Sequence, residues 1–511
     1  MKYSKIFLLF PLIGILAVSC SPGSHSSSLG NTTSSEESTS ATTTQQPIVS
    51  EDGVYDFYCV NDFHGSILER DDSYYESGIK KYFSKLKQLK EADPEHTFIF
   101  SAGDMFQGSL ESNYYYGQVV VDAMNEAGFD AMAIGNHEFD YGQDKLFANI
   151  EGADFPFLGG NILKWDGGQT DEPFDDRVKA STIIERGGNK VGIIGMIGGT
   201  LETSITGACI SNCYFANPEK LIKQESESLR AQGCSMIILL IHDDVRSLYG
   251  FSDIKDYVDG VFTGHSHSKN LTLVGDGVPA VQSYCNGQYI SHFSLQIKDL
   301  EVTCTDQGII QASPSWTVDQ GIEAVVDSYL DDDFEAMANR VAGTLSGQLN
   351  KTEVGNLGAR AIYEEYVKKY PDIMFAIENS QRASLYPGDI TYSDLYKATP
   401  FTNQVCIIEV QGVDIVSTLG RNCAYTDKEN AFASIELTEY YQVAVIDYLA
   451  THQSESKSYD YFPSLNGDGK IIASYATYPM DLSFDYIQNE LGGVIDADDF
   501  ASGQGGFSPY R

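Results

Sequence analysis

The stretch Asn-His-Glu-Phe-Asp at residues 136–140 lies at the end of the apolar run Ala-Met-Ala-Ile at residues 131–134, with only Gly135 between them. A short apolar run of this kind is typical of a buried strand. An amide and a histidine placed directly after such a strand are of the types that bind divalent metal ions. In an open α/β sheet, ligands gather outside the carboxyl ends of the strands. The stretch therefore predicts a site at one edge of a sheet.

The same arrangement occurs at four more places in the first half of the chain. The apolar runs 57–60, 97–100, 236–241 and 258–262 are followed or ended by residues that can bind metal, which are Asp62, His64, Asp104, His242, His265 and His267. Five of the nine histidines lie at these five strand ends, a distribution that packing alone would not produce. Because the strand ends converge at one edge, we expect a single shared site.

The residue types at the five strand ends fit a pair of divalent cations held without thiolates. Asp62 and His64 are two residues apart in an extended segment, so both point to the same side and can share one ion. The two oxygens of Asp104 can bridge two ions. Two metals about 3.5–4 Å apart are a recurring device for displacement at phosphorus. We therefore predict a dinuclear centre, of zinc, manganese or a similar metal.

Each of these features also has a structural explanation. A pair such as Asp62 and His64 occurs by chance in many chains, and a histidine that ends a strand, such as His242, is often a helix cap or a buried hydrogen-bonded residue. The ordered set of all five strand ends is what favours the metal centre over these alternatives.

The composition limits the class of partner. The chain has 511 residues, with 33 Lys and Arg against 72 Asp and Glu, which gives a formal net charge of −39. A length of this order predicts two domains. Nucleic-acid binding needs a basic stripe, so DNA and RNA are excluded as expected partners. A small anionic substrate stays possible where metal ions reverse the local charge.

The N-terminal residues predict export. Residues 1–20 carry Lys2 and Lys5 before the apolar run 6–18, which is too short to span a bilayer and is typical of a signal peptide. Ala-Val-Ser-Cys at residues 17–20 resembles a lipobox, which implies a lipid on Cys20 and a membrane-anchored, extracytoplasmic protein. An ordinary signal peptide with an incidental cysteine is the alternative. Residues 21–50 are rich in Ser and Thr and predict a flexible linker.

The remaining chain divides into two parts. Residues 51–317 alternate strands with helices, which favours an α/β domain whose buried strands are covered by helices on both faces. The helices are expected at 78–91, 117–127 and 218–231, and the strands at 55–60, 97–100, 131–134, 191–197, 236–241 and within 278–297. Residues 318–343 predict one amphipathic linker helix, and residues 344–511 a second, smaller α/β domain.

Four segments resemble one enzyme family. Asp-Phe-His-Gly at 62–65, Ala-Gly-Asp-Met-Phe-Gln-Gly-Ser at 102–109, Gly-Asn-His-Glu-Phe-Asp-Tyr-Gly at 135–142 and Gly-His-Ser-His at 264–267 resemble the calcineurin-like metallophosphoesterases, and within them the 5′-nucleotidase branch. The resemblance implies a four-layer α/β/β/α fold for the first domain. The stretch Ile-His-Asp-Asp at 241–244 departs from the pattern, since the family more often has Ser before this histidine and Gly after it.

The resemblance also implies roles for single residues. Asp62, His64, Asp104 and His267 would bind one metal, and Asp104, Asn136, His242 and His265 the other. His137 would not bind metal but would donate to the phosphoryl or leaving oxygen as a general acid, oriented by Asp140. Asp140 can also be a helix N-cap, which is compatible with that role.

The second domain resembles the nucleotidase C-terminal domain more loosely. The resemblance implies that Arg382 binds phosphate, that Phe401 and Tyr448 stack on the base, that Asn403 contacts the base and that Asp460 takes the ribose position. A solvated arginine and a core phenylalanine are the alternatives for the first two. The Gly-Gly-Asp-Gly segment of the family is replaced here by Ser-Tyr-Asp-Tyr at 458–461, and residues 344–351 lack the family's additional arginines.

The sequence therefore predicts a lipid-anchored phosphohydrolase that converts nucleoside 5′-monophosphates to nucleosides. A nucleotide-sugar or 2′,3′-cyclic nucleotide hydrolase is the second hypothesis, and a lipoprotein that binds nucleosides or metal without turnover is the third. A monomer is expected. Cys209 and Cys213, four residues apart, could form a local disulfide, bind metal or be simply buried.

Overall fold

The computed structural model describes residue 48 and residues 50–71, 75–379, 381–401, 403–452 and 459–501. The predicted signal peptide, the lipid on Cys20 and nearly all of the linker at 21–50 lie outside these residues. No helix in the described part of the chain is both long enough and apolar enough to cross a membrane.

Two six-stranded sheets form the first half of the chain. The first has the order β17 (Glu301–Gln311), β16 (Tyr289–Lys298), β1 (Gly53–Val60), β4 (Thr97–Ser101), β5 (Ala131–Ala133) and β6 (Phe157–Leu158). The second has the order β14 (Lys269–Val274), β15 (Val278–Ser283), β13 (Gly260–Thr263), β12 (Met236–His242), β10 (Asn189–Ile197) and β9 (Ser181–Arg186). Neighbouring strands from β1 to β6, and from β10 to β15 through β12 and β13, are parallel.

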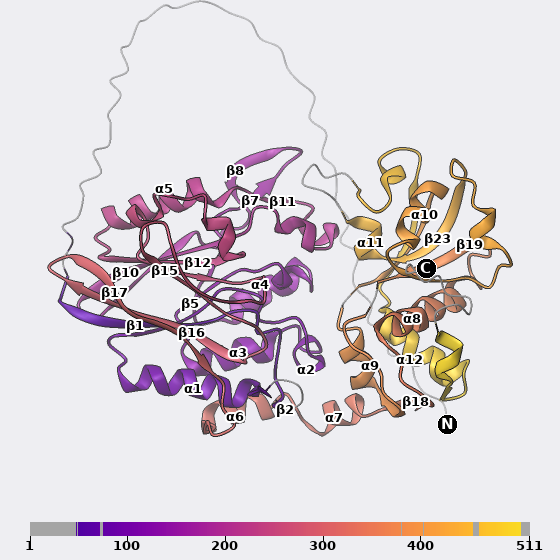
Figure 1. Cartoon of the computed structure of the whole chain (residues 1–511), viewed down its shortest axis with the longest axis horizontal. Coiled ribbons are helices and arrows are strands. Elements are labelled where there is room, and N and C mark those ends of the chain that lie inside the picture. The colour runs from indigo at the N-terminus through magenta and orange to yellow at the C-terminus, as the bar shows by residue number, and fades with distance from the viewer. Residues whose placement is uncertain are drawn as a thin grey trace, which may run out of the picture. The chain divides into compact units, whose positions relative to one another are not determined.

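The two sheets pack face to face, with helices on the outer face of each. Tyr55, Phe57 and Cys59 of β1 alternate along the strand and pack against Met236 and Phe262 of the second sheet. Helices α1 (Gly78–Ala92) and α3 (Gln118–Ala127) cover one outer face, and α5 (Pro218–Ala231) the other. Figure 1 shows α5 on one side of the pair of sheets and α1 and α3 on the other. The four-layer α/β/β/α fold is confirmed, whereas the predicted cover of helices on both faces of one sheet is not found for either of these two sheets in the described residues.

The predicted helices agree closely with the structure. Helix α1 buries Ile79, Tyr82, Phe83 and Leu86 on one face, which follows the three- and four-residue spacing of the sequence. Helix α5 begins at Pro218, a favoured first position, after an asparagine cap. Two further helices, α2 (Leu110–Asn113) and α4 (Gln143–Gly152), and the small sheet β11 (Cys213–Phe215), β7 (Ile162–Trp165) and β8 (Gln169–Pro173) complete this part.

The segment after β17 contains two helices, α6 (Gln320–Asp327) and α7 (Asp332–Ala338), so the prediction of one linker helix at 318–343 is wrong. The Asp331 carboxylate accepts the backbone N–H of Phe334 at 2.9 Å and starts a new helix there. Val326 of α6 packs into the core of the first sheet's outer face, whereas Phe334 of α7 packs into the core of the C-terminal part. The break therefore falls where one hydrophobic core gives way to the next.

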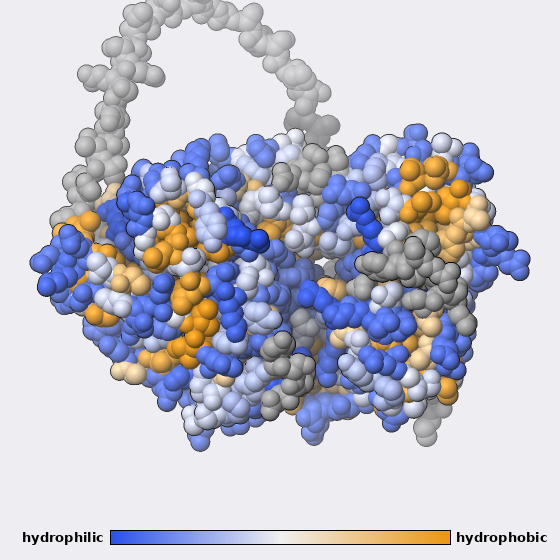
Figure 2. Space-filling view, viewed as in Figure 1, coloured by the Kyte–Doolittle hydropathy of each residue, from blue (hydrophilic) through white to orange (hydrophobic). Residues whose placement is uncertain are grey.

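The C-terminal part contains a five-stranded sheet and a three-stranded sheet. The larger has the order β22 (Cys423–Tyr425), β19 (Ile373–Glu378), β23 (Tyr440–Ile446), β21 (Val405–Gln411) and β24 (Lys470–Tyr475), and the smaller β20 (Gly388–Thr391), β18 (Val341–Leu345) and β25 (Val494–Ile495). The helices are α8 (Lys351–Tyr366), α9 (Tyr392–Ala398), α10 (Gly412–Leu419), α11 (Asp447–Thr451) and α12 (Pro479–Asn489). Figure 2 shows a mostly hydrophilic surface with an apolar patch over α10, where Val413 and Val416 are exposed.

No cysteine of the described residues forms a disulfide. Cys213 is buried at the start of β11, and Cys209 lies partly buried near the site described below. Cys209 and Cys213 therefore form neither the local disulfide nor one of the clusters of potential metal ligands found in the described residues.

Candidate metal centre and substrate cavity

The structure brings the seven predicted metal ligands together at the carboxyl ends of parallel strands. Asp62 and His64 follow β1, Asp104 follows β4, Asn136 follows β5, His242 ends β12, and His265 and His267 follow β13. The Asn136 Oδ1 atom lies 3.0 Å from His265 Nδ1 and 3.2 Å from His242 Nε2. Side chains from both sheets thus meet at one point.

The potential ligand atoms form neighbouring groups whose members lie within 4.8 Å of one another. One group contains Asp62, His64 and His267, and another contains Asp104, His242 and His265. In the first, the Nε2 atoms of His64 and His267 are 2.9 Å apart. A third group joins Asp104 and His64 to His137, so the groups are contiguous.

The donor atoms fit divalent cations. Nδ1 of His64 contacts the backbone carbonyl of Gln107 at 2.9 Å, and Nδ1 of His242 contacts that of Ala102 at 2.8 Å. A carbonyl can only accept a hydrogen bond, so in both rings Nδ1 carries a proton and Nε2 is the nitrogen turned to the centre, as in metal-binding histidines. The Oδ2 atom of Asp104 is buried, and His242 Nε2 is 3.1 Å away. These two atoms face the same space, where a cation would take the place of the His242 Nε2 proton.

The backbone at the ligands is strained. Five of the seven ligands have positive φ angles, namely Asp62 (50°), His64 (51°), Asp104 (57°), His265 (69°) and His267 (48°). Positive φ is uncommon for residues other than glycine and costs on the order of 1–3 kcal/mol at each position. Strain of this kind clusters at functional sites, where the surrounding structure maintains it.

Glu138 connects the loop that carries Asp104 to the loop that carries Asn136 by hydrogen bonds, a role that was not predicted from the sequence. Its buried carboxylate accepts the backbone N–H groups of Asp104 (2.8 Å), Met105 (2.7 Å) and Gly135 (2.7 Å). At Gly135 a Cβ atom would lie 2.3 Å from the Asp104 carboxylate, so the two loops also approach too closely for a side chain there. Asp104 and Asn136 are therefore fixed relative to each other.

Burial sets the charge of most of the histidines. It lowers the pKa of His64 to about 3 and that of His265 and His267 to about 4, which leaves these imidazoles neutral and able to bind a cation. Asp104 and His242 form a tightly coupled pair in which burial opposes both charges. Their mutual attraction outweighs it, so the pKa of Asp104 is well below its ordinary value and that of His242 is raised to about 10.

His137 differs from its neighbours. Its Nδ1 atom lies 2.7 Å from Asp140 Oδ2. Burial lowers the pKa of His137, but the carboxylates of Asp140 and Asp104 outweigh burial and raise it to about 9. The ring is therefore protonated at neutral pH and can donate a proton.

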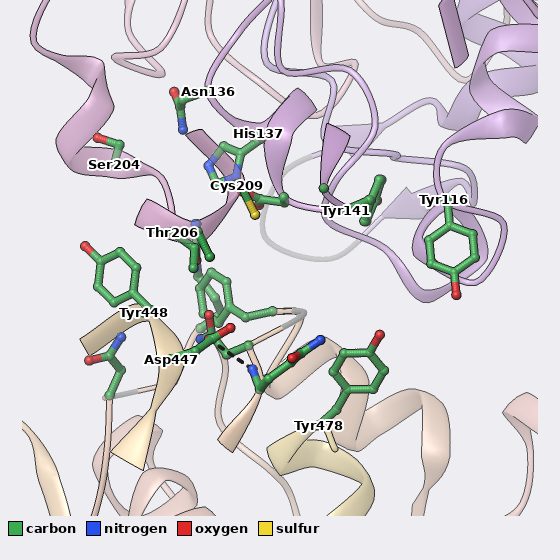
Figure 3. Close-up of a pocket in the computed structure, with 18 of the residues that line it drawn as sticks. Tyr116, Asn136, His137, Tyr141, Ser204, Thr206, Cys209, Asp447, Tyr448 and Tyr478 are labelled. Atoms are coloured by element: carbon green, nitrogen blue, oxygen red, sulfur yellow. Dashed lines mark hydrogen bonds and ion pairs between the residues drawn. The ribbon is translucent and has the colours of Figure 1, made fainter. Parts of the chain in front are cut away.

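A cavity of about 490 Å³ opens onto this centre. Asn136, His137 and His265 line it from the first domain, and four of the five predicted substrate residues line it from the C-terminal part, namely Arg382, Phe401, Asn403 and Tyr448. The Arg382 guanidinium carbon lies 5.1 Å from the centre of the Phe401 ring. Figure 3 shows His137 facing the space, with Tyr448 at one end and Tyr116 and Tyr478 at the other.

Asp460, predicted at the ribose position, does not line the cavity. Its carboxylate lies 3.5 Å from Nδ1 of His452 instead. Asp447 is the carboxylate that lines the wall beside Tyr448, and burial raises its pKa to about 6. Asp447 could have been found from the sequence, because it directly follows the apolar strand β23 and directly precedes Tyr448.

Comparison with known proteins agrees with this geometry. Residues 55–269 match the family model described as calcineurin-like phosphoesterase, and residues 336–448 match the 5′-nucleotidase C-terminal domain. The second domain thus carries a 5′-nucleotidase C-terminal domain, and the first belongs to the calcineurin-like phosphoesterase family. This family uses two divalent metals, which the paired ligand groups fit.

Among its relatives are a 5′-nucleotidase of Mus musculus, 27% identical over 66% of this chain and 64% of the relative, and a snake venom 5′-nucleotidase of Naja atra, 31% identical over 46% of each chain. These matches span less than two thirds of the relatives' own length. The crystal structure of a 5′-nucleotidase precursor from Thermus thermophilus has the same fold, with a TM-score of 0.68 and 20% identity over 87% of this chain and 99% of that one.

Proposed function

We propose that this protein is a metal-dependent phosphohydrolase that releases phosphate from nucleotides, with nucleoside 5′-monophosphates as substrates. One observation carries the proposal: the His137 ring, in contact with Asp140, opens into the same cavity as the metal ligands Asn136 and His265 and the aromatic residues Phe401 and Tyr448. A phosphate bound at the centre and a base bound between aromatic rings would fit that single space.

In this proposal Asp62, His64, Asp104 and His267 hold one divalent cation, and Asp104, Asn136, His242 and His265 hold the other. The two cations, Zn²⁺ or Mn²⁺, would supply Lewis-acid activation of the phosphoryl group and of water. The strained loops and the carbonyl contacts of His64 and His242 keep the donors in place before any cation arrives.

His137 would act as the proton donor. The imidazolium held by Asp140 faces the cavity, where it can donate to a phosphoryl oxygen and then to the leaving oxygen of the nucleoside. General acid assistance of this type contributes about 10²–10⁴-fold. Asp140 keeps the proton on the ring and fixes the ring's orientation.

The C-terminal part would choose the substrate. Arg382 would bind the phosphate, Phe401 and Tyr448 would stack on the base, and Asn403 would contact its edge. The Asp460 carboxylate lies outside the cavity wall, so we assign the carboxylate contact with the ribose to Asp447 instead. Residues from both proposed domains, 51–317 and 344–511, line the cavity. Neither domain alone would therefore suffice for nucleotide hydrolysis.

The test is phosphate release from AMP, UDP-glucose, 2′,3′-cyclic AMP and a nitrophenyl ester, with Mn²⁺ or Zn²⁺ added. The expected result is release from AMP above the others, lowered by about 10²–10⁴-fold in His137→Ala. His96→Ala is a matched control, because His96 also contacts a carboxylate three residues away, Asp93, at 2.9 Å but outside the site.

The same assay separates the alternatives. Preferred hydrolysis of UDP-glucose or of the cyclic nucleotide would replace the monophosphate assignment with one of those activities. If the protein binds metal but releases phosphate from none of these compounds, the result would favour the third hypothesis, a lipoprotein that binds nucleosides or metal without turnover.

We also infer an extracytoplasmic location with a lipid anchor on Cys20. The signal-like residues 1–20 support this, and the two relatives named above include a protein of snake venom. The Cys20→Ala variant should move the protein from the membrane fraction to the soluble fraction. Retention in the membrane fraction would contradict the anchor.

A further inference from the structure

A second cavity, of about 190 Å³, borders the metal centre on the side of His64 and His267. Three cations, Arg70, Arg382 and Lys397, and one carboxylate, Glu76, line it. Arg382 also lines the larger cavity, so it stands between the two. The space is several times the roughly 30 Å³ that one water molecule takes up in the liquid, so it has room for a small anion with its waters.

Among the described residues, Arg70 and Lys397 have only distant ionic partners. The closest Arg70 atom lies 3.9 Å from Glu76 Oε2, and the Lys397 ammonium lies 4.0 Å from Asp394 Oδ1. Elsewhere in this acidic chain cations pair closely, as in Lys90 with Asp130 at 2.8 Å.

Both carboxylates also accept hydrogen bonds from other donors, at both oxygens in Glu76 and at Oδ2 in Asp394. Glu76 accepts hydrogen bonds from Ser66 at 3.3 Å and from Asn286 at 3.0 Å. Asp394 accepts the backbone N–H and the hydroxyl of Thr391 at the start of α9. Arg70 and Lys397 thus line this cavity without a close ion pair among the described residues, and three cations stand there against one carboxylate in a chain of net charge −39.

We propose that this second cavity binds a phosphate ion distinct from the phosphate held at the metals. Arginine and lysine around a small cavity suit a compact dianion. The proposal rests on the proposed function in one respect, since hydrolysis would deliver orthophosphate beside His64 and His267. The product could then leave past Arg70 and Lys397 without crossing the cavity that holds the nucleoside.

The first experiment measures orthophosphate binding by calorimetry with the Mn²⁺-loaded protein at constant ionic strength. The wild type should bind two phosphates, and the double variant Arg70→Gln/Lys397→Gln one. The control is Arg421→Gln/Lys368→Gln, which removes the same charges at exposed positions that line neither cavity. Equal melting temperatures of the three proteins exclude unfolding as the cause. The proposal would be wrong if the wild type bound only one phosphate per protein, or if the double variant still bound two.

The second experiment measures inhibition of AMP hydrolysis by phosphate. Phosphate that binds beside a bound nucleotide gives mixed inhibition, and the double variant should weaken the uncompetitive inhibition constant at least tenfold. Purely competitive inhibition of the wild type would also overturn the proposal. If no nucleotide is hydrolysed, the proposed function is wrong. The calorimetric experiment would still show whether phosphate binds in the second cavity.

A third comparison distinguishes a free ion from a phosphate carried by the substrate. If the cavity takes a second phosphate group of a nucleotide, the double variant raises KM for ADP at least fivefold more than KM for AMP. Equal changes assign the site to free orthophosphate.

Discussion

Replacing Glu138 with Gln should loosen the metal centre without touching a ligand. The carboxylate accepts three backbone N–H groups, two at Oε2 and one at Oε1. An amide of the same shape has only one oxygen. If that oxygen takes the position of Oε2, the amide NH₂ faces the N–H of Met105, and one hydrogen bond is lost. If it takes the other position, two are lost.

The size of the effect follows from these contacts. Hydrogen bonds to charged groups contribute about 1.5–3 kcal/mol each, and a donor left buried without an acceptor costs more. We therefore expect a loss of about 2–4 kcal/mol in the free energy of unfolding of the metal-free protein. For a domain of this size that corresponds to a fall of about 5–10 °C in Tm. Because Asp104 and Asn136 lose their fixed separation, affinity for Mn²⁺ should fall by about 10–100-fold, as for other residues that orient metal ligands.

Scanning calorimetry of the metal-free protein and a Mn²⁺ titration are the two assays. Glu202→Gln is the matched control, because Glu202 is also buried but its Oε1 atom accepts the backbone N–H of Phe215 at 2.8 Å, a bond that an amide oxygen can keep. A folded Glu138→Gln protein with the Mn²⁺ affinity and kcat of the wild type would refute the assignment of Glu138 as the tie between the loops.

Four other changes test separate parts of the structure. Asp140→Asn removes a charge that holds the pKa of His137 at about 9 against burial, so kcat should fall by about 10–100-fold and the alkaline limb of the pH–rate profile should move to lower pH; an unmoved limb would argue against the pair. Burial raises the pKa of Glu378 to about 8, above an unfolded value of about 4.3, so its contribution to stability is full below about pH 4.3 and is lost as pH rises through 8. Glu378→Gln should therefore have a higher Tm than the wild type at pH 9, and a Tm difference that does not change with pH would contradict this. EDTA should lower Tm by several degrees and Mn²⁺ should restore it, since a ligand of the folded state stabilises that state. Phe401→Ala should raise KM for AMP by about 10–100-fold, with hydrolysis of a nitrophenyl ester little changed, which steady-state kinetics can show.

Much of the site was predictable because metal ligands at strand ends leave a local signature. The ligand positions after β1, β4, β5 and β13 follow from an apolar run and the residue type next to it. The two-sheet arrangement could not be derived from that pattern. A strand buried under a helix and a second sheet has the same apolar run as a strand buried under two helices.

The remaining features depend on contacts that sequence spacing does not encode. The positive φ angles at His64 and Asp104 exist because the surrounding loops impose them. Glu138 lies within a recognisable motif, but its role depends on N–H groups more than 30 residues away in sequence. The prediction for Asp460 depends on analogy with a glycine-rich segment that this chain lacks, and the carboxylate that lines the cavity beside Tyr448 is that of Asp447.

The break between α6 and α7 has a consequence for how this protein can evolve. The loops with the metal ligands are built on a hydrophobic core that ends near Val326, while Phe334 packs into the core beneath the residues proposed to contact the base. If the proposed function holds, mutations that reshape the second core can change the leaving group that is accepted without disturbing the geometry of the metal ligands. Descendants can thus inherit the hydrolytic centre unchanged while the range of compounds they accept diversifies.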